Sequence, residues 1–251
     1  FFGYGDRTYS SILFGFGQNS INRAGQVDYL TSLYDQPQYV TSNSDFINKM
    51  PKERGLQSTI NVEKINWLYV PDSLLYHRRW GPFGGNIPVK LYLHWQKVLI
   101  SSFPSMTYKR HPKGHSLFRK LSNTDLKNIL LPTGKDITIT SENFYKIYNQ
   151  YEGFIFDHIS TAFMVATATD KPIIYFNLGK RKLTEEADKI IKNRCLWIDV
   201  DPANPGDLRE EVESKKKFSK SNSVTMNFSL DNSNLKISRE EKLIDTINSL
   251  N

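Results

Sequence analysis

Residues 152–177, EGFIFDHISTAFMVATATDKPIIYFN, contain a complete structural unit. The apolar run 153–156 ends in Asp157 and His158, and a segment rich in Ala and Met begins after Ser160 and Thr161. Asp-Lys-Pro at 170–172 ends that helix, because a residue before proline is pushed out of the α region, and a second apolar run follows. This order predicts a βαβ unit, which is the building block of a parallel sheet.

Ser160 and Thr161 stand at the start of the helix in this unit. In an open α/β sheet, ligands bind beyond the carboxyl ends of the strands, where a helix N-terminus offers free N–H groups and a partial positive charge to an anion. The two hydroxyls would either cap the helix or donate hydrogen bonds to a phosphate. Their spacing leaves both interpretations open.

Strand and helix patterns alternate over residues 62–220 and predict one α/β domain with a Rossmann-like parallel sheet. The expected strands are residues 66–70, 106–109, 137–140, 153–156, 173–176 and 196–200. The expected helices are residues 89–103, 116–121, 142–148 with Ser141 as a cap, 184–192, and a segment that begins after 205–207.

The two ends of the chain differ from this domain. Residues 1–61 have poor periodicity and glycines typical of turns, and we interpret them as a remnant of an N-terminal domain or an interdomain segment. Residues 221–251 are expected to form a charged linker and a C-terminal docking helix with a Ser238–Glu241 capping box. Because the chain begins with Phe1, we expect that an N-terminal part has been removed.

Composition restricts the class of partner. The 251 residues are 39% hydrophobic, enough to bury a core, and no stretch has the uninterrupted apolar length needed to cross a bilayer. A net charge of +7 favours an anionic partner, namely a nucleotide, a nucleic acid, an acidic polysaccharide or an anionic lipid surface. The single cysteine, Cys195, forms no internal disulfide and is expected to be a buried structural residue.

A second polar cluster, YKRHPKGH at 108–115, follows the expected strand 106–109. Proline after His111 forbids α geometry there, so the imidazole is held in an extended turn among Lys109, Arg110 and Lys113. A histidine among cations suits a phosphate, because it donates a hydrogen bond or a proton to a leaving oxygen while the cations offset the developing charge. The alternative for each lysine is a solvated basic turn.

YKRHPKG, FIFDHISTAF and DKPIIYF together resemble the paired His-Pro and Ser/Thr motifs of GT-B-like transferases that build bacterial surface polymers. These include capsular Kdo transferases, polysialyltransferases and CDP-glycerol glycerophosphotransferases. The order WLYVP, an aromatic helix with Trp95-Gln96, then YKRHPKG is most similar to the LIC12162 family of surface-carbohydrate transferases. The resemblance covers residues 65–180 and implies a GT-B C-terminal-type domain.

The resemblance implies that His111 contacts the donor phosphates as the catalytic residue, and that Ser160 and Thr161 bind the same phosphate. It implies a nucleotide-sugar or CDP-alcohol donor, a polysaccharide or lipid-linked acceptor, and a cytoplasmic enzyme at the inner face of the membrane, with no nucleic acid. His158 departs from the usual Asp-Tyr that precedes the Ser/Thr pair, which puts its role and that of Asp157 in question. The general base normally lies in the N-terminal domain, where Asp6 is the nearest acidic candidate.

Other signals are weaker. Arg78 and Arg79 in a glycine-rich loop would contact the donor or the acceptor, or else lie in a solvated loop. The Asp199-Val200-Asp201 motif precedes a proline and is interpreted as a turn. The histidines lack a metal-ligand spacing, so neither a metal nor a cofactor is expected. Two alternative functions remain, a nucleotide-sugar epimerase of GT-B architecture and a non-catalytic polyanion-binding module.

Overall fold

The computed structural model describes residues 12–16, 38–42, 64–72, 87–103, 105–111, 122–131, 136–169, 171–180, 183 and 185–215. The chain divides into two compact units, one of residues 1–52 with 223–251 and one of residues 53–222. In the first unit, strands β1 (Ile12–Phe16) and β2 (Gln38–Ser42) pair in parallel. Gly15, expected in a turn, lies in β1 instead. The domain boundaries at residues 61 and 221 stay predictions.

The second unit contains a six-stranded sheet in the order β5-β4-β3-β6-β7-β8, in which every neighbouring pair is parallel. The strands are β3 (Trp67–Val70), β4 (Met106–Lys109), β5 (Thr138–Thr140), β6 (Gly153–Phe156), β7 (Ile173–Asn177) and β8 (Leu196–Asp199). Counted along this sheet, the order is 3-2-1-4-5-6, that of a doubly wound nucleotide-binding fold. The predicted Rossmann-like α/β fold is confirmed.

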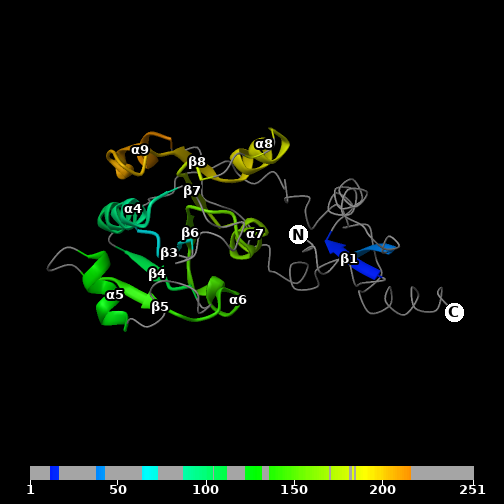
Figure 1. The fold of residues 1–251 in the computed structure, drawn as a ribbon, viewed down its shortest axis with the longest axis horizontal. Coiled ribbons are helices and arrows are strands. Elements are labelled where there is room, and N and C mark those ends of the chain that lie inside the picture. The colour runs from blue at the N-terminus through cyan, green and yellow to red at the C-terminus, as the bar shows by residue number, and fades with distance from the viewer. Residues whose placement is uncertain are drawn as a thin grey trace. The chain divides into compact units, whose positions relative to one another are not determined.

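Helices cover both faces of this sheet (Figure 1). One face carries α4 (Val89–Ser102), α5 (Asn123–Leu130) and α9 (Leu208–Ser214), and the other carries α6 (Phe144–Ile147), α7 (Thr161–Thr167) and α8 (Glu185–Arg194). A 3₁₀ turn, η1 (Tyr148–Gln150), follows α6. With both faces covered, the strands β3, β6 and β7 are buried and read as continuous apolar runs, which explains why the sequence located them.

Aromatic side chains fill the space between α4 and the sheet. Trp95 of α4 is fully buried and its ring meets that of Phe176 edge-on, with centroids 5.1 Å apart. Trp67 lies opposite Gly153 in the register of β3 and β6. A Cβ atom at residue 153 would collide with the indole ring of Trp67, so glycine is required where β6 begins.

Two described helices differ from the expectation. The sequence pattern did not predict α5, although Ser122 and Asp125 form a complete capping box at its start. The helix expected at 142–148 begins at Phe144 with Asn143 as the N-cap in place of Ser141, because the Asn143 side chain accepts the Tyr145 N–H. The helices expected at 116–121 and near the C-terminus lie outside the described residues. In the described parts of the chain, no helix has the length and apolar character that a membrane span requires.

Candidate functional site

The carboxyl edge of the sheet contains the point at which the strand order reverses, between β3 and β6. Asp72 follows β3 and Asp157 follows β6, so both acids stand at this reversal. In open α/β sheets the ligand crevice lies outside the carboxyl ends of the strands at such a point. The topology therefore selects this edge as the candidate site.

Asp157 is the centre of a buried hydrogen-bond network. Its side chain is fully buried, and its Oδ2 atom accepts bonds from three side chains of β3 and α4. The donors are the Tyr69 hydroxyl at 2.6 Å, the Tyr92 hydroxyl at 2.7 Å and the Trp95 indole nitrogen at 3.0 Å. Burial, and then the Asp157 carboxylate, raise the pKa of Tyr69 and Tyr92, so both hydroxyls stay protonated donors. One carboxylate thus ties β3, β6 and α4 together.

The other oxygen of Asp157, Oδ1, faces the loop ends. It accepts the backbone N–H of Asp72 at 3.2 Å, and it lies 3.4 Å from Nδ1 of His158 and 3.5 Å from Nζ of Lys180. Burial alone would raise the pKa of Asp157, but the charge of Lys180 and the hydrogen bonds of the network lower it well below its ordinary value. The group is therefore an ionised carboxylate.

Lys180 was not singled out in the sequence, and a short turn brings it to the site. The Asn177 side chain accepts the Gly179 N–H at 3.2 Å, and Gly179 has a φ of 66°, a left-handed conformation that suits glycine. The Lys180 ammonium then lies 3.5 Å from Oδ2 of Asp72 and 4.0 Å from the centroid of the Tyr92 ring. Asn-x-Gly after a buried strand was the signal that could have indicated a tight turn at this edge.

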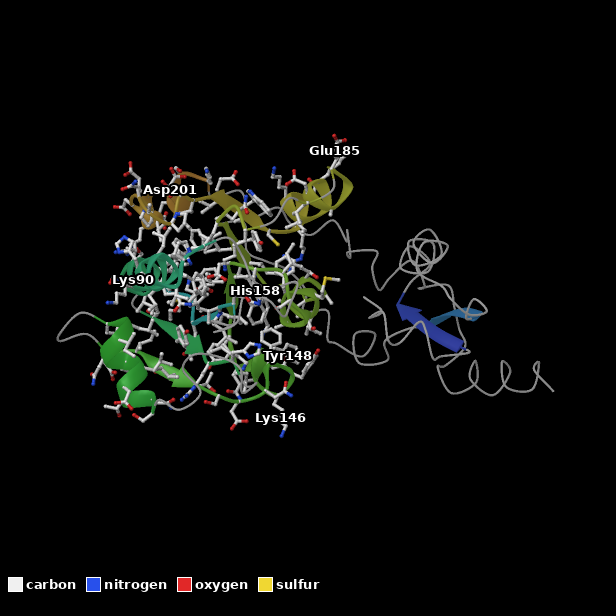
Figure 2. All side chains as sticks on the ribbon, viewed as in Figure 1. Lys90, Lys146, Tyr148, His158, Glu185 and Asp201 are labelled. Carbon is white, nitrogen blue, oxygen red and sulfur yellow. The ribbon has the colours of Figure 1, made fainter. Side chains whose placement is uncertain are left out.

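A cleft of about 450 Å³, counted with its opening to solvent, borders this cluster. Its lining is partly charged and partly aromatic, and the rings of Tyr175 and Trp197 in it stack with centroids 4.6 Å apart. Figure 2 shows His158 near the middle of the sheet, whereas Lys146 and Glu185 lie at its margins. The lining residues are Asp72, Asp157, His158, Ile159, Tyr175, Asn177, Leu178, Lys180, Leu183 and Trp197.

His111 and the Ser160–Thr161 pair leave the same edge of the sheet. Tyr69 of β3 pairs with Tyr108 of β4 on one side and with Ile155 of β6 on the other. The loops after β4 and β6 are thus two strand spacings apart, on the order of 10 Å. The lining of the cleft includes His158 but not His111, Ser160 or Thr161.

Ser160 is the N-cap of α7, and its hydroxyl oxygen accepts the Phe163 N–H at 3.3 Å. The capping interpretation is therefore correct for Ser160, although its hydroxyl proton stays available to a ligand because a hydroxyl both accepts and donates. Thr161 is the first residue of α7 and is exposed. The roles of both hydroxyls toward a phosphate stay predictions.

The basic residues around His111 have different environments. Lys109 is 4% exposed, its ammonium donates to the Arg110 carbonyl at 3.3 Å, and burial lowers its pKa to about 8 against an opposing effect of Glu142. The Arg110 guanidinium donates to the Asn123 side chain of α5 at 3.2 Å. The remaining predicted contacts, Lys113, Arg78 and Arg79, lie outside the described residues.

The acids of the Asp199-Val200-Asp201 motif have protein partners, as expected of a turn. Asp199 accepts bonds from the Asn177 amide at 2.7 Å and the Trp197 indole at 2.9 Å, and Asp201 accepts the Ala203 N–H at 2.9 Å. No three potential metal-ligating side chains gather in the described part of the chain, which leaves the expectation of a metal-free reaction untested. Cys195 is buried, and burial raises its pKa to about 12.

Comparisons with known proteins add little to this geometry. Neither the protein-family models nor the curated proteins give a match to the sequence. A chain of the solved structure titled "Crystal structure of GtfA/B complex" is similar over 94% of this chain, with 14% sequence identity and a TM-score of 0.42. The match spans 44% of that chain, less than half of its length.

Proposed function

We propose that this chain is the donor-binding part of a GT-B-like transferase. The enzyme would move a sugar or a glycerol-phosphate-type group from a nucleotide-activated donor to a surface-polysaccharide or lipid-linked acceptor in bacteria. One observation carries the proposal. The loop with His111 and the loop with Ser160 and Thr161 leave the same edge of a parallel sheet on either side of β3, where the strand order reverses.

In this proposal the donor phosphates lie between the two loops. His111 donates a hydrogen bond or a proton to the leaving phosphate oxygen, and the hydroxyls of Ser160 and Thr161 hold the same group. Arg110 and Lys109 offset the negative charge that develops there. The pKa of Lys109 is about 8, so its ammonium keeps its proton at neutral pH, and a bound phosphate would stabilise that charged form further.

The general base and the acceptor site are expected from a separate N-terminal domain. This division of labour follows from the resemblance to GT-B-like enzymes, in which the donor and the acceptor are bound by different domains. The donor is a substrate, so the proposed reaction uses no further cofactor and no metal. The enzyme would work in the cytoplasm at the inner membrane face, where lipid-linked acceptors are reached.

Replacing His111 with alanine tests the assignment. Consumption of the donor should fall by about 10²–10⁴-fold, because that is the usual contribution of a positioned general acid. The melting temperature should stay unchanged, since His111 lies two residues beyond the end of β4 and is only partly buried. His94→Ala, on the exposed face of α4, is the matched control and should keep full activity. Near wild-type turnover in His111→Ala would reject the proposal.

A nucleotide screen should be done first, because it identifies the nucleotide part of the donor. CMP, CDP, UDP and GDP are compared by their effect on the melting temperature, and a nucleotide present at 100 times its Kd stabilises the folded state by about 2.7 kcal/mol. A donor site prefers one nucleotide and tolerates salt. Binding of any polyanion with a steep salt dependence would indicate a polyanion-binding module instead. Release of nucleotide from the donor without any acceptor would indicate an epimerase.

A further inference from the structure

Two buried nitrogen atoms in the cleft make no hydrogen bond within the described part of the chain. They are Nζ of Lys180 and Nδ1 of His158, and only one other such side-chain atom, Nε2 of Gln96, is recorded there. The Lys180 side chain is 10% exposed and that of His158 is 12% exposed. Their nearest carboxylate oxygens lie 3.4–3.5 Å away, longer than a good hydrogen bond. Because buried polar groups are nearly always hydrogen-bonded, two such nitrogens lining one cleft point to a ligand oxygen as their partner.

The charges around these donors restrict what that ligand group is. The Lys180 ammonium lies between two carboxylates, 3.5 Å from Oδ2 of Asp72 and 3.5 Å from Oδ1 of Asp157. Among the described side chains at this point, the two carboxylates carry more charge than the single ammonium. An anionic oxygen next to these carboxylates would be repelled, because like charges at short range repel. The described part of the cluster therefore favours a neutral ligand group over a phosphate.

A hydroxyl group fits the cluster better, because it accepts one hydrogen bond and donates another. It would accept from the Lys180 ammonium or from the imidazole of His158 and donate to the Asp72 carboxylate. Asp157 has a different role in the subsite. Its two oxygens already accept from Tyr69, Tyr92, Trp95 and the Asp72 backbone, so it fixes Lys180 in place by charge.

We propose that Asp72, His158 and Lys180 form a subsite that selects neighbouring hydroxyl groups of the bound ligand. The subsite rests on the proposed function, since it takes the hydroxyl-bearing part of the same donor whose phosphate lies between His111 and Ser160. The hydroxyls belong either to the ribose or to the transferred sugar or polyol. The carbon face of that group would lie against the aromatic part of the cleft lining, which is formed by Tyr175 and Trp197.

Lys180→Met tests the subsite because it removes the charge and the donors while keeping the length of the side chain. The probes are inorganic pyrophosphate, CDP and UDP, 2′-deoxy-CDP and 2′-deoxy-UDP, and UDP-glucose and CDP-glycerol. We expect Lys180→Met to weaken the affinity for the preferred hydroxyl-bearing probe about tenfold or more and to leave the affinity for pyrophosphate unchanged. Lys215→Met is the matched control, because its ion pair with Glu211 lies on α9 with the side chain 47% exposed.

The probes also distinguish the two sources of the hydroxyls. If they belong to the ribose, the wild type binds CDP or UDP more tightly than the 2′-deoxy form, and Lys180→Met binds both equally. If they belong to the transferred group, the wild type prefers UDP-glucose or CDP-glycerol to the parent diphosphate, and Lys180→Met loses that preference.

Two results would overturn the subsite. One is an equal loss of pyrophosphate affinity in Lys180→Met, which would make Lys180 a phosphate-binding residue. The other is unchanged affinity for every probe while pyrophosphate binds, which would leave the proposed function standing. If no probe binds, pyrophosphate included, the proposed function fails and the subsite with it. If Lys180→Met does not fold, Asp72→Asn/Lys180→Met removes opposite charges together and is judged by the same criteria.

Discussion

The buried cations at the two edges of the six-stranded sheet differ in their hydrogen bonding. At the amino edge, Lys171 donates to the carbonyls of Tyr148, Asn149 and Tyr151, and Arg194 donates to those of Thr167, Thr169 and Lys171. Most of these carbonyls lie in or directly after η1 or at the end of α7, where the helix dipole is negative, and that of Lys171 lies just before β7. Both cations are thereby satisfied by the fold itself.

At the carboxyl edge, Lys180 is buried to a similar degree but has charged neighbours without a hydrogen bond in the described part of the chain. Lys171 is 8% and Arg194 is 6% exposed, against 10% for the side chain of Lys180, so burial does not separate them. The three cations differ in their hydrogen bonds. Burial of a cation sets its desolvation cost, whereas its hydrogen-bond partners show whether the fold or a ligand offsets that cost.

The largest effect is expected for Asp157→Ala. The substitution leaves the hydroxyls of Tyr69 and Tyr92 and the Trp95 indole without their shared acceptor, and it leaves the Lys180 ammonium with only one of its two neighbouring carboxylates. Removing one partner of a buried charge cluster costs about 3–5 kcal/mol of unfolding free energy, measured by urea denaturation. Asp188→Ala is the control, because its pair with Lys192 on α8 is solvent-exposed and contributes at most about 1 kcal/mol. A cost below about 1 kcal/mol for Asp157→Ala would mean that this edge is not held by the carboxylate.

Arg194→Met tests the other edge and should affect stability alone. It removes the charged donor to three carbonyls between the end of α7 and the start of β7, so we expect a loss of about 2–3 kcal/mol of unfolding free energy. Pyrophosphate affinity, measured where the variant is fully folded, should not change. Arg209→Met, on the exposed side of α9, is the control for loss of an arginine. A change in pyrophosphate affinity in Arg194→Met would break the distinction between the two edges.

The central strands of the sheet were predictable, since β3, β6 and β7 are short apolar runs that end in polar or turn residues. The predicted strands at 106–109 and 153–156 coincide with β4 and β6. The capping box of Ser122 was overlooked although it is local, so α5 was within reach of the sequence. The placement of His111, Ser160 and Thr161 at one edge also followed from the sequence, because a parallel sheet brings all carboxyl ends of its strands to one edge. Their roles toward a phosphate stay predictions.

The Asp157 network was not predictable, because it depends on strand order and register. Its donors Tyr69 and Trp95 lie 88 and 62 residues away in sequence, and Lys180 arrives from the next strand. Helical spacing indicated correctly that Trp95 is buried, but no local pattern tells which acceptor its indole nitrogen reaches. Asp72 and Asp157 become neighbours only because the strand order reverses between β3 and β6.

The smallest expected effect on stability comes from Lys109, a buried cation at the carboxyl edge of the sheet. Burial lowers its pKa from 10.5 to about 8, so below pH 8 both the folded and the unfolded chain hold the proton and the cost of burial is constant. Between pH 8 and pH 10.5 the unfolded chain binds a proton that the folded chain has released, so stability rises with pH in that window.

Relative to Lys109→Met, this rise should be on the order of 1 kcal/mol after solvent screening, measured by urea denaturation at several pH values. Parallel profiles for the two proteins would show that Lys109 does not titrate in that window. With saturating pyrophosphate, the rise should begin at higher pH, because an anion beside Lys109 favours the charged ammonium. If pyrophosphate does not shift the pH at which stability rises, Lys109 does not contact the bound phosphate. The phosphate would then be bound by His111, Arg110 and the hydroxyls at the start of α7.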